Sequence, residues 1–401
     1  MTVANPLEQL TESDLREQRT SVKWHAFAPD VLPLWVAEQD SVLAEPVVRT
    51  VVEAMQRSDT GYVFSGKEYA EALASFAVDR WGWSELDPER TAIVPDVMIG
   101  VTEMLRLVTA PGDKVVVNCP VYPPFYSFVR SMDRQIVEAP LTAEHRLDLD
   151  TLSDAFAAAT AGGARAAYLL CSPHNPTGTL HTAEELEAVA ALAQQHDVRV
   201  VADEIHAPLV YPGHAFVPFL SVPGGERGLS LMSASKGWNL AGLKGALAIA
   251  GPEAAADLAR LPEEVGHGAS HLAVMAHIAA FRDGGMWLDA LLDGLDANRH
   301  LLAELLAEHL PTVGYQLPEA TYLSWLDCRA LGVEDPPAEP GLVTLSVGPA
   351  ALFAREAKVG LSAGTAFGTG GSGHVRLNFA TSQAILTQAI EQMGRAVAGA
   401  R

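Results

Sequence analysis

One lysine in this sequence lies among hydroxyl and glycine residues, directly after a short apolar run. The segment runs from Ser233 to Lys244, with Lys236 next to Ser235. A lysine condenses with an aldehyde only as the neutral amine, so a site that lowers its pKa could use it to form a Schiff base. The hydroxyls of Ser233 and Ser235, together with the cation of Lys244, suit a phosphate group. Lys236 is therefore the candidate Schiff-base lysine, and other segments must support it because most lysines are surface charges.

Two further polar segments each follow an apolar, strand-like run. Asn175-Pro176-Thr177-Gly178 comes after residues 166–170, and Asp203-Glu204-Ile205-His206 comes after residues 198–202. Taken alone, the first is a good turn sequence, and an acid at a strand end is usually a cap or a solvated charge. Open α/β sheets, however, form their ligand crevices at the carboxyl ends of strands. We therefore expect Asn175, Asp203 and Lys236 to share one crevice.

The elements that must position these residues alternate between short apolar runs and helical patterns. This rhythm is typical of βαβ units and a mostly parallel sheet that is covered on both faces. Thr182 and Glu185 form a capping box at the start of one such helix. A long helical pattern over residues 287–309 is expected to bridge two domains. Strands are expected at residues 92–94, 114–117, 166–170, 198–202, 229–232 and 374–379.

Composition narrows the class of protein. The 401 residues are 49% hydrophobic, which indicates a soluble globular chain with a large core. The formal charge of -22 opposes nonspecific binding to nucleic acid or anionic lipid. The three cysteines have neither disulfide nor zinc spacing, so no metal is predicted. No secretory signal is visible in residues 1–14, and four prolines exclude a membrane span at 207–225. We expect a cytoplasmic protein without a nucleic-acid or membrane partner.

In this order and spacing, the motifs resemble the fold-type I pyridoxal-phosphate enzymes of the class I/II aminotransferase family. The resemblance covers nearly the whole chain. It implies an α/β fold of the aspartate-aminotransferase type, with a mostly parallel seven-stranded sheet between helices and a smaller α+β domain. It also implies a large cofactor-binding domain at residues 46–285 and a small domain formed by residues 1–45 and 286–401. The first forty-odd residues are expected to pack against the C-terminal domain or a partner subunit.

The resemblance assigns the cofactor, pyridoxal 5'-phosphate, to named residues. Lys236 would hold it covalently. Asp203 would lie against the pyridine nitrogen, because a carboxylate keeps that nitrogen protonated and a pyridinium is the better electron sink. Asn175 and His206 would donate to the phenolic oxygen of the ring, although the family often has tyrosine where this sequence has His206. Tyr122 would stack on the ring.

The remaining cofactor contacts concern the phosphate. The resemblance implies that hydroxyls, a cation and a helix N-terminus hold it. Tyr62 would reach the phosphate of the neighbouring subunit, which makes a homodimer part of the site. The other implied phosphate contacts are Ser233, Ser235, Lys244 and the backbone N–H groups of Gly100, Val101 and Thr102.

Particular segments resemble one group of enzymes within this family. Arg376 would bind the α-carboxylate of an amino-acid substrate, with Asn175 and Ala37 beside it. The similarity is greatest to the MalY/PatB-type cystathionine β-lyases, also called carbon-sulfur lyases. Their usual Val-Ala-Asp-Met-Asp is replaced here by Val-Ala-Glu-Gln-Asp, with Glu38 and Gln39 at the changed positions, and this difference leaves the substrate open. The segments that carry the similarity are 23–24, 32–40, 122–125, 203–206 and 236–239.

The function implied is β-elimination from cystathionine or another cysteine S-conjugate, which yields a thiol, pyruvate and ammonia. Lys236 would be the base, with Tyr122 or Tyr62 as helpers. Two alternatives stay open. An aminotransferase acting on an L-amino acid would share the early steps, and a regulatory protein could use the same fold to bind a partner.

Overall fold

The computed structural model describes residues 3–337, 340–341 and 347–399. Its largest sheet has seven strands in the order β2-β8-β7-β6-β5-β3-β4, and only β8 runs antiparallel to its neighbours. This mixed, mostly parallel sheet is the one expected from the sequence. The strands are β1 Leu32–Pro33, β2 Thr91–Val94, β3 Lys114–Val117, β4 Gln135–Glu138, β5 Ala166–Cys171, β6 Val198–Asp203, β7 Leu229–Met232, β8 Ala246–Ala250, β9 Gly314–Tyr315, β10 Leu323–Asp327, β11 Val359–Gly360, β12 Ser362–Ala363 and β13 His374–Asn378.

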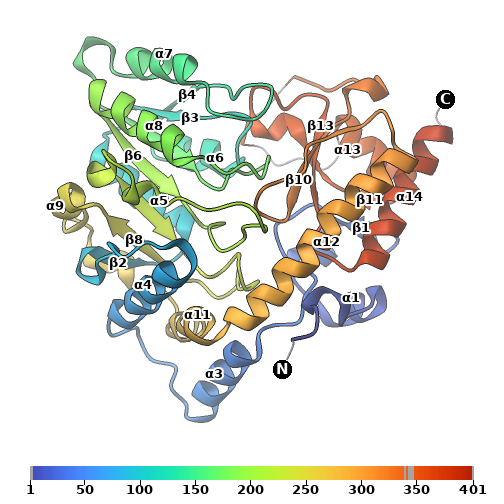
Figure 1. The fold of residues 1–401 in the computed structure, drawn as a ribbon, viewed down its shortest axis with the longest axis horizontal. Coiled ribbons are helices and arrows are strands. Elements are labelled where there is room, and N and C mark those ends of the chain that lie inside the picture. The colour runs from blue at the N-terminus through green and yellow to red at the C-terminus, as the bar shows by residue number, and fades with distance from the viewer. Residues whose placement is uncertain (1–2, 338–339, 342–346, 400–401) are drawn as a thin grey trace.

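Helices cover both faces of the large sheet, as Figure 1 shows. Successive side chains of a strand point to opposite faces. Val115 and Val117 accordingly join the core beneath α5, whereas Val116 joins the core beneath α7 and α8. The α-helices are α1 Glu12–Gln18, α2 Val22–His25, α3 Glu45–Gln56, α4 Lys67–Trp81, α5 Val97–Val108, α6 Pro124–Ser131, α7 Leu149–Ala159, α8 Ala183–Gln195, α9 Ala255–Leu258, α10 Glu263–Gly266, α11 His271–Asp283, α12 Gly285–His309, α13 Gly348–Leu352 and α14 Gln383–Gly399.

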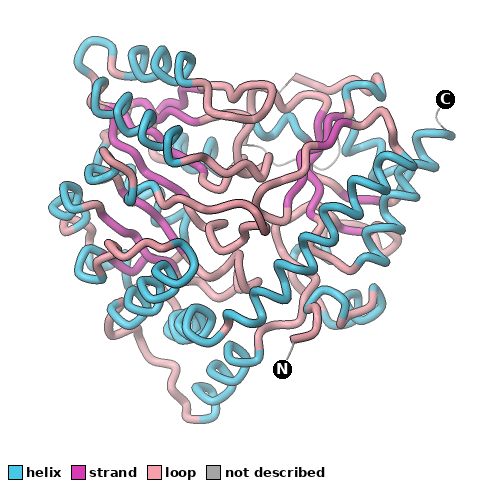
Figure 2. Tube along the Cα trace, viewed as in Figure 1, coloured by secondary structure: helices cyan, strands magenta, loops and turns pink. Residues whose placement is uncertain are grey.

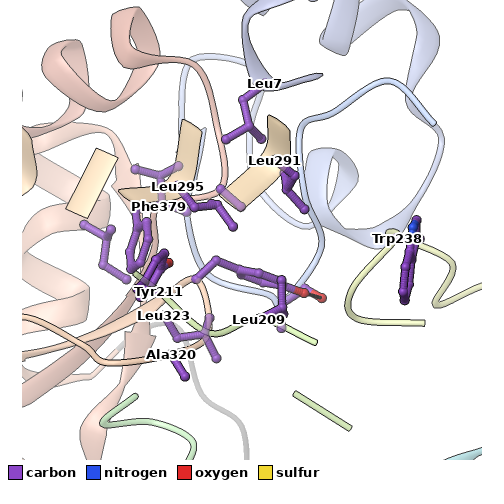
Figure 3. Packing of buried hydrophobic residues seen from close by; sticks show 14 of the residues in the cluster. Leu7, Leu209, Tyr211, Trp238, Leu291, Leu295, Ala320, Leu323 and Phe379 are labelled. Atoms are coloured by element: carbon purple, nitrogen blue, oxygen red, sulfur yellow. Dashed lines mark hydrogen bonds between the residues drawn. The ribbon is translucent and has the colours of Figure 1, made fainter. Parts of the chain in front are cut away.

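A second, antiparallel sheet has the order β12-β13-β10-β9 and lies beside α12 and α14 (Figure 1). The long helix α12 extends from the region of α11 to this sheet, as the tube in Figure 2 shows. Figure 3 shows why the parts hold together. Leu7 of the N-terminal segment, Leu291 and Leu295 of α12 and Leu323 of β10 belong to one buried cluster.

The expected elements are largely confirmed. The strands predicted at 92–94, 114–117, 166–170, 198–202, 229–232 and 374–379 all form, with ends shifted by one residue at most. The capping box at Thr182 and Glu185 is present. Within the large sheet, β4 and β8 are the strands that the sequence did not single out. The N-terminal segment packs against the C-terminal part, since Leu32 of β1 pairs with Val359 of β11. Within the described residues, no helix is both long enough and apolar enough to cross a membrane.

Candidate active site

The carboxyl ends of β5, β6 and β7 meet at one edge of the large sheet. Cys171 ends β5 directly beside Asp203, which ends β6 and pairs in turn with Leu231 of β7. A cavity of about 260 Å³ opens there. The residues that line it are Ala37, Asp96, Val97, Met98, Tyr122, Pro124, Phe128, Cys171, Asn175, Asp203, Ile205, His206, Ser233, Ser235, Lys236, Ala241, Leu243, Lys244 and Gly245.

Lys236 lies in the turn that follows β7. Its Nζ donates a hydrogen bond to the carbonyl oxygen of Ala37 over 2.8 Å. Burial and, to a smaller extent, the charge of Arg376 lower the pKa of the Lys236 amine to about 8, while the charge of Glu38 acts in the opposite direction. A substantial share of the amine is therefore neutral near physiological pH. This is the property that attack on an aldehyde requires.

Asp203 presents a buried carboxyl group to the same cavity. Its Oδ1 accepts a hydrogen bond from the backbone N–H of Ile205 over 3.2 Å. Burial raises the pKa of Asp203 to about 7, with the hydrogen bond and the Lys236 charge opposing the rise. A cation placed against this carboxyl would favour its ionised form. The thiol of Cys171 next to it has its pKa raised well above the usual value by burial and stays neutral.

His206 and Asn175 flank the cavity with polar side chains. Burial holds the pKa of His206 well below its usual value, so the imidazole is neutral. Its Nδ1 is buried and has no hydrogen-bond partner among the described residues. A buried polar atom of this kind usually has a partner, so a ligand atom could supply it. The Oδ1 of Asn175 accepts from Arg376 Nη1 over 3.1 Å, which fixes the amide.

The helix α5 directs its N-terminus at the cavity. Asp96 is the N-cap, and its Oδ1 accepts from the N–H of Ile99 over 2.8 Å. Val97 and Met98 in the first turn line the cavity, and first-turn amides have no acceptor within their own helix. Lys244 completes this end, with its Nζ 3.0 Å from Asp96 Oδ2. Amides and a cation together form an anion receptor.

The prediction that the amides of Gly100, Val101 and Thr102 face the phosphate is wrong in its register. The structure places all three one turn inside α5, and none of them lines the cavity. The N–H of Gly100 donates instead to the carbonyl of Asp96 over 2.8 Å. Gly100 is small for a different reason, because a Cβ there would lie 2.5 Å from Leu231 Cδ1 of β7. An Asp followed by an apolar helical pattern is an N-cap signal, and it could have set the helix start correctly.

The hydroxyls predicted at the phosphate end are both in the cavity wall. Ser233 Oγ donates to the carbonyl of Gly245 over 2.8 Å and accepts from the N–H of Ser235 over 3.2 Å. Ser233 therefore also holds the turn that carries Lys236. Tyr122 lines the cavity as well, and burial raises its pKa to about 12, so the phenol is neutral.

Arg376 reaches the site from the second sheet, where it lies on β13. Its Nη2 donates to the carbonyl of Trp35 over 2.9 Å. Burial lowers its pKa to about 10, which leaves the guanidinium charged at neutral pH. Among the described residues its side chain donates to neutral oxygens only, and its Nε lacks any hydrogen-bond acceptor. A buried, charged guanidinium with a free donor suits a carboxylate ligand.

Tyr62 lies apart from the cavity of its own chain. It is 93% exposed in a loop between α3 and α4. Tyr322 was not singled out from the sequence. Its hydroxyl donates over 2.9 Å to the carbonyl of Ala37, the same oxygen that accepts from Lys236. No sequence signal connects these residues, because they are far apart in the chain.

The donor set fits pyridoxal phosphate. An amine with a lowered pKa, a buried carboxyl group, a neutral histidine with a free nitrogen and an anion receptor surround one cavity. These groups match an aldehyde, a ring nitrogen, a phenolic oxygen and a phosphate, respectively. Asp96 is the one group of opposite character, because its carboxylate lies at the phosphate end and pairs with Lys244.

Comparisons with known proteins agree with this geometry. Residues 35–393 match the family described as "Aminotransferase class I and II". A "Putative cystathionine beta-lyase" of Mycobacterium tuberculosis strain CDC 1551 / Oshkosh is 58% identical, over 98% of this chain and 99% of the relative. The cystathionine beta-lyase PatB of Bacillus subtilis is 32% identical over 96% of this chain and 99% of its own. The PLP-bound C-S lyase of Staphylococcus hominis has a TM-score of 0.85 and 25% identity, with 98% of each chain covered. The chain therefore belongs to the class I and II aminotransferase family, with its α/β fold type I.

Proposed function

We propose that this protein is a pyridoxal-phosphate-dependent carbon-sulfur β-lyase that acts on cystathionine or a related cysteine S-conjugate. The observation that carries the proposal is that Lys236 and Asp203 line one cavity, while Arg376 donates a hydrogen bond to Asn175 in the wall of that cavity. The relative at 58% identity and PatB, both of which are named as cystathionine β-lyases, support it. When bound, pyridoxal phosphate would supply an electron sink for negative charge at Cα, which allows the β-thiolate to leave.

Residues of this chain would bind the substrate and transfer its protons. Arg376 binds the α-carboxylate through its free donor and thereby orients the Cα–H bond. Lys236 Nζ, next to the Ala37 carbonyl, accepts the Cα proton in its neutral form and returns a proton to the departing thiolate. With water consumed in the final hydrolysis, the products are one thiol, one pyruvate and one ammonia.

Apart from the helix amides, the other contacts keep the roles that the family resemblance implied. Asp203 would hold negative charge against the ring nitrogen, and His206 and Asn175 would donate hydrogen bonds to the phenolic oxygen. Tyr122 would cover the ring face. Its phenol is neutral near pH 7, because burial raises its pKa to about 12, so it would act as a hydrogen-bond donor. We assign the phosphate to Val97 and Met98 amides, Ser233, Ser235 and Lys244.

The proposed assembly is a homodimer with shared active sites. Tyr62 and Phe64 are 93% and 101% exposed, and Val48, Val52 and Met55 of the nearby α3 are also exposed. Several large apolar side chains exposed on one helix and the loop that follows it are typical of an interface. In a two-fold dimer each chain gives the same residues to the other, so Tyr62 would reach the partner's phosphate.

The proposed domain division is 46–285 for the large domain and 1–45 with 286–401 for the small domain. The strands of the seven-stranded sheet all lie between residues 91 and 250. The pairing of β1 with β11 associates the N-terminal segment with the C-terminal part. A cytoplasmic location is also proposed, supported by Cys119, Cys171 and Cys328, which are buried free thiols.

A lactate-dehydrogenase-coupled assay tests the proposed chemistry. Purified protein loaded with pyridoxal phosphate should release pyruvate from cystathionine without any keto-acid acceptor. An aminotransferase would need the acceptor and would release no pyruvate by elimination. A regulatory protein would bind the cofactor, turn over every thioether poorly and retain a partner in a pull-down. Pyruvate formation that depends on added keto acid would refute the lyase proposal.

A further inference from the structure

A second cavity adjoins the active site on the side of the N-terminal segment. Its volume is about 400 Å³, and every lining residue except Ala241 and Gly242 is polar. Ala241 also lines the first cavity. Glu38, in the wall of the second cavity, directly follows Ala37, whose carbonyl accepts from Lys236. The two cavities therefore share Ala241, and Ala37 of the first is the chain neighbour of Glu38 in the second. The lining residues are Gln18, Arg19, Thr20, Ser21, Glu38, Asn239, Ala241 and Gly242.

This second cavity carries one anion and one cation. The Oε2 of Glu38 accepts a hydrogen bond from Ser21 Oγ over 2.6 Å. Arg19 Nη2 donates to the carbonyl of Ser41 over 2.5 Å. Neither Glu38 nor Arg19 forms an ion pair with any described residue, whereas Lys23 and Asp40 close by form a buried pair at 2.8 Å. Each charge is thus available to a ligand of opposite sign.

The backbone beside Glu38 is held firmly. Asn239 and Gln39 exchange two hydrogen bonds of 2.9 Å, from Gln39 N to Asn239 Oδ1 and from Asn239 Nδ2 to Gln39 O. Lys23 Nζ donates to the carbonyl of Glu38 over 3.1 Å. These contacts connect the segment to the turn that carries Lys236. A charge on a fixed backbone loses little entropy when it binds a ligand.

We propose that Glu38 and Arg19 form a subsite for the far end of a thioether substrate, where the leaving thiol carries its own amino-acid group. Glu38 would bind the ammonium and Arg19 the carboxylate of that group. The proposal rests on the proposed lyase function. It explains why the acidic residue at position 38 has no basic partner in the described chain, and it favours cystathionine-like substrates over S-alkylcysteines.

The test compares cystathionine with S-butylcysteine, whose leaving thiol has no charge. In Glu38→Gln and Arg19→Gln, kcat/KM for cystathionine should fall roughly tenfold or more, as expected for the loss of one charge-assisted contact. The value for S-butylcysteine should change much less. Because Glu38 also raises the pKa of Lys236, the ratio of the two values at one pH is the decisive quantity. Arg395→Gln, at an exposed arginine of α14, is the matched control.

A binding measurement separates this subsite from the chemistry. In a Lys236→Ala background loaded with pyridoxal phosphate, calorimetry should show that Glu38→Gln weakens the binding of cystathionine but not that of S-butylcysteine. If either variant lowers kcat/KM equally for both substrates, or leaves the ratio of the two kcat/KM values unchanged, the subsite is wrong while the lyase function stands. If wild-type protein makes no pyruvate from either substrate, the lyase function itself fails.

Discussion

Replacing Asp203 with asparagine should change how the stability of the cofactor-free protein depends on pH. Asp203 is 4% exposed, and burial raises its pKa from 3.8 to about 7. The folded chain therefore keeps a proton that the unfolded chain loses between these two values. The stabilisation is fully present below the lower value and is lost as pH rises through the upper one.

The magnitude follows from the width of this window. Each pH unit corresponds to about 1.4 kcal/mol, so about three units give about 4 kcal/mol. The asparagine side chain would not titrate, and its oxygen can still accept from the Ile205 amide. The free energy of unfolding of Asp203→Asn, relative to wild type, should thus rise by about 4 kcal/mol between about pH 4 and about pH 8.

Urea unfolding of both cofactor-free proteins across this pH range measures the difference directly. Taking the difference between the two curves removes the titration of every other group to first order. Asp197→Asn, at an exposed carboxylate, is the control for a general effect of the substitution. A difference that stays constant with pH would refute the buried-carboxyl reasoning.

The same substitution should slow the chemistry of the cofactor-bound protein. The ring nitrogen would no longer face a negative charge, so the exchange rate of the substrate Cα proton should fall on the order of 10²-fold or more. Proton NMR in deuterated buffer follows this exchange. An unchanged rate would show that Asp203 does not support the electron sink.

The remaining predictions concern other cavity residues and the partner contact. Borohydride reduction and peptide mapping should label Lys236, and Lys236→Ala should lose both the label and the covalent link to the cofactor. The rate at which cofactor-free protein takes up pyridoxal phosphate should rise with pH, with a midpoint near the Lys236 pKa of about 8, because only the neutral amine reacts. Arg376→Gln should move that midpoint upward, since the Arg376 charge helps to lower the pKa; a downward shift would contradict the assignment. Asp96→Asn should raise the affinity for the cofactor several-fold in a fluorescence titration, because the substitution removes a negative charge from the phosphate end. Weaker binding would show that the ion pair of Asp96 with Lys244 is needed instead. Mixing Lys236→Ala with Tyr62→Phe subunits should restore activity above either parent, and an active monomer by light scattering would exclude the shared site.

Much of the catalytic arrangement could be predicted from the chain alone. The apolar runs before Asn175, Asp203 and Lys236 are buried on both faces of a mostly parallel sheet, and such strands are recognisable without partners. Because parallel strands end at one edge, residues that follow them along the chain must also meet in space. The cavity lined by all three residues confirms this expectation.

The sequence by itself determined which motifs follow which strands and what chemistry their side chains can do. Both depend only on local sequence. The N-cap signal at Asp96 could have set the start of α5, but only the tertiary structure showed that its first turn lines the cavity while Gly100 lies against Leu231. Only the tertiary structure brought Glu38 and Arg19 to a common wall beside Asn239. It also shows the contact by which Arg376 on β13 meets Asn175 in the turn after β5, which the sequence indicated only through the family resemblance. Contacts of this kind join segments distant in the chain, and their positions depend on how the two sheets pack, which no local pattern encodes.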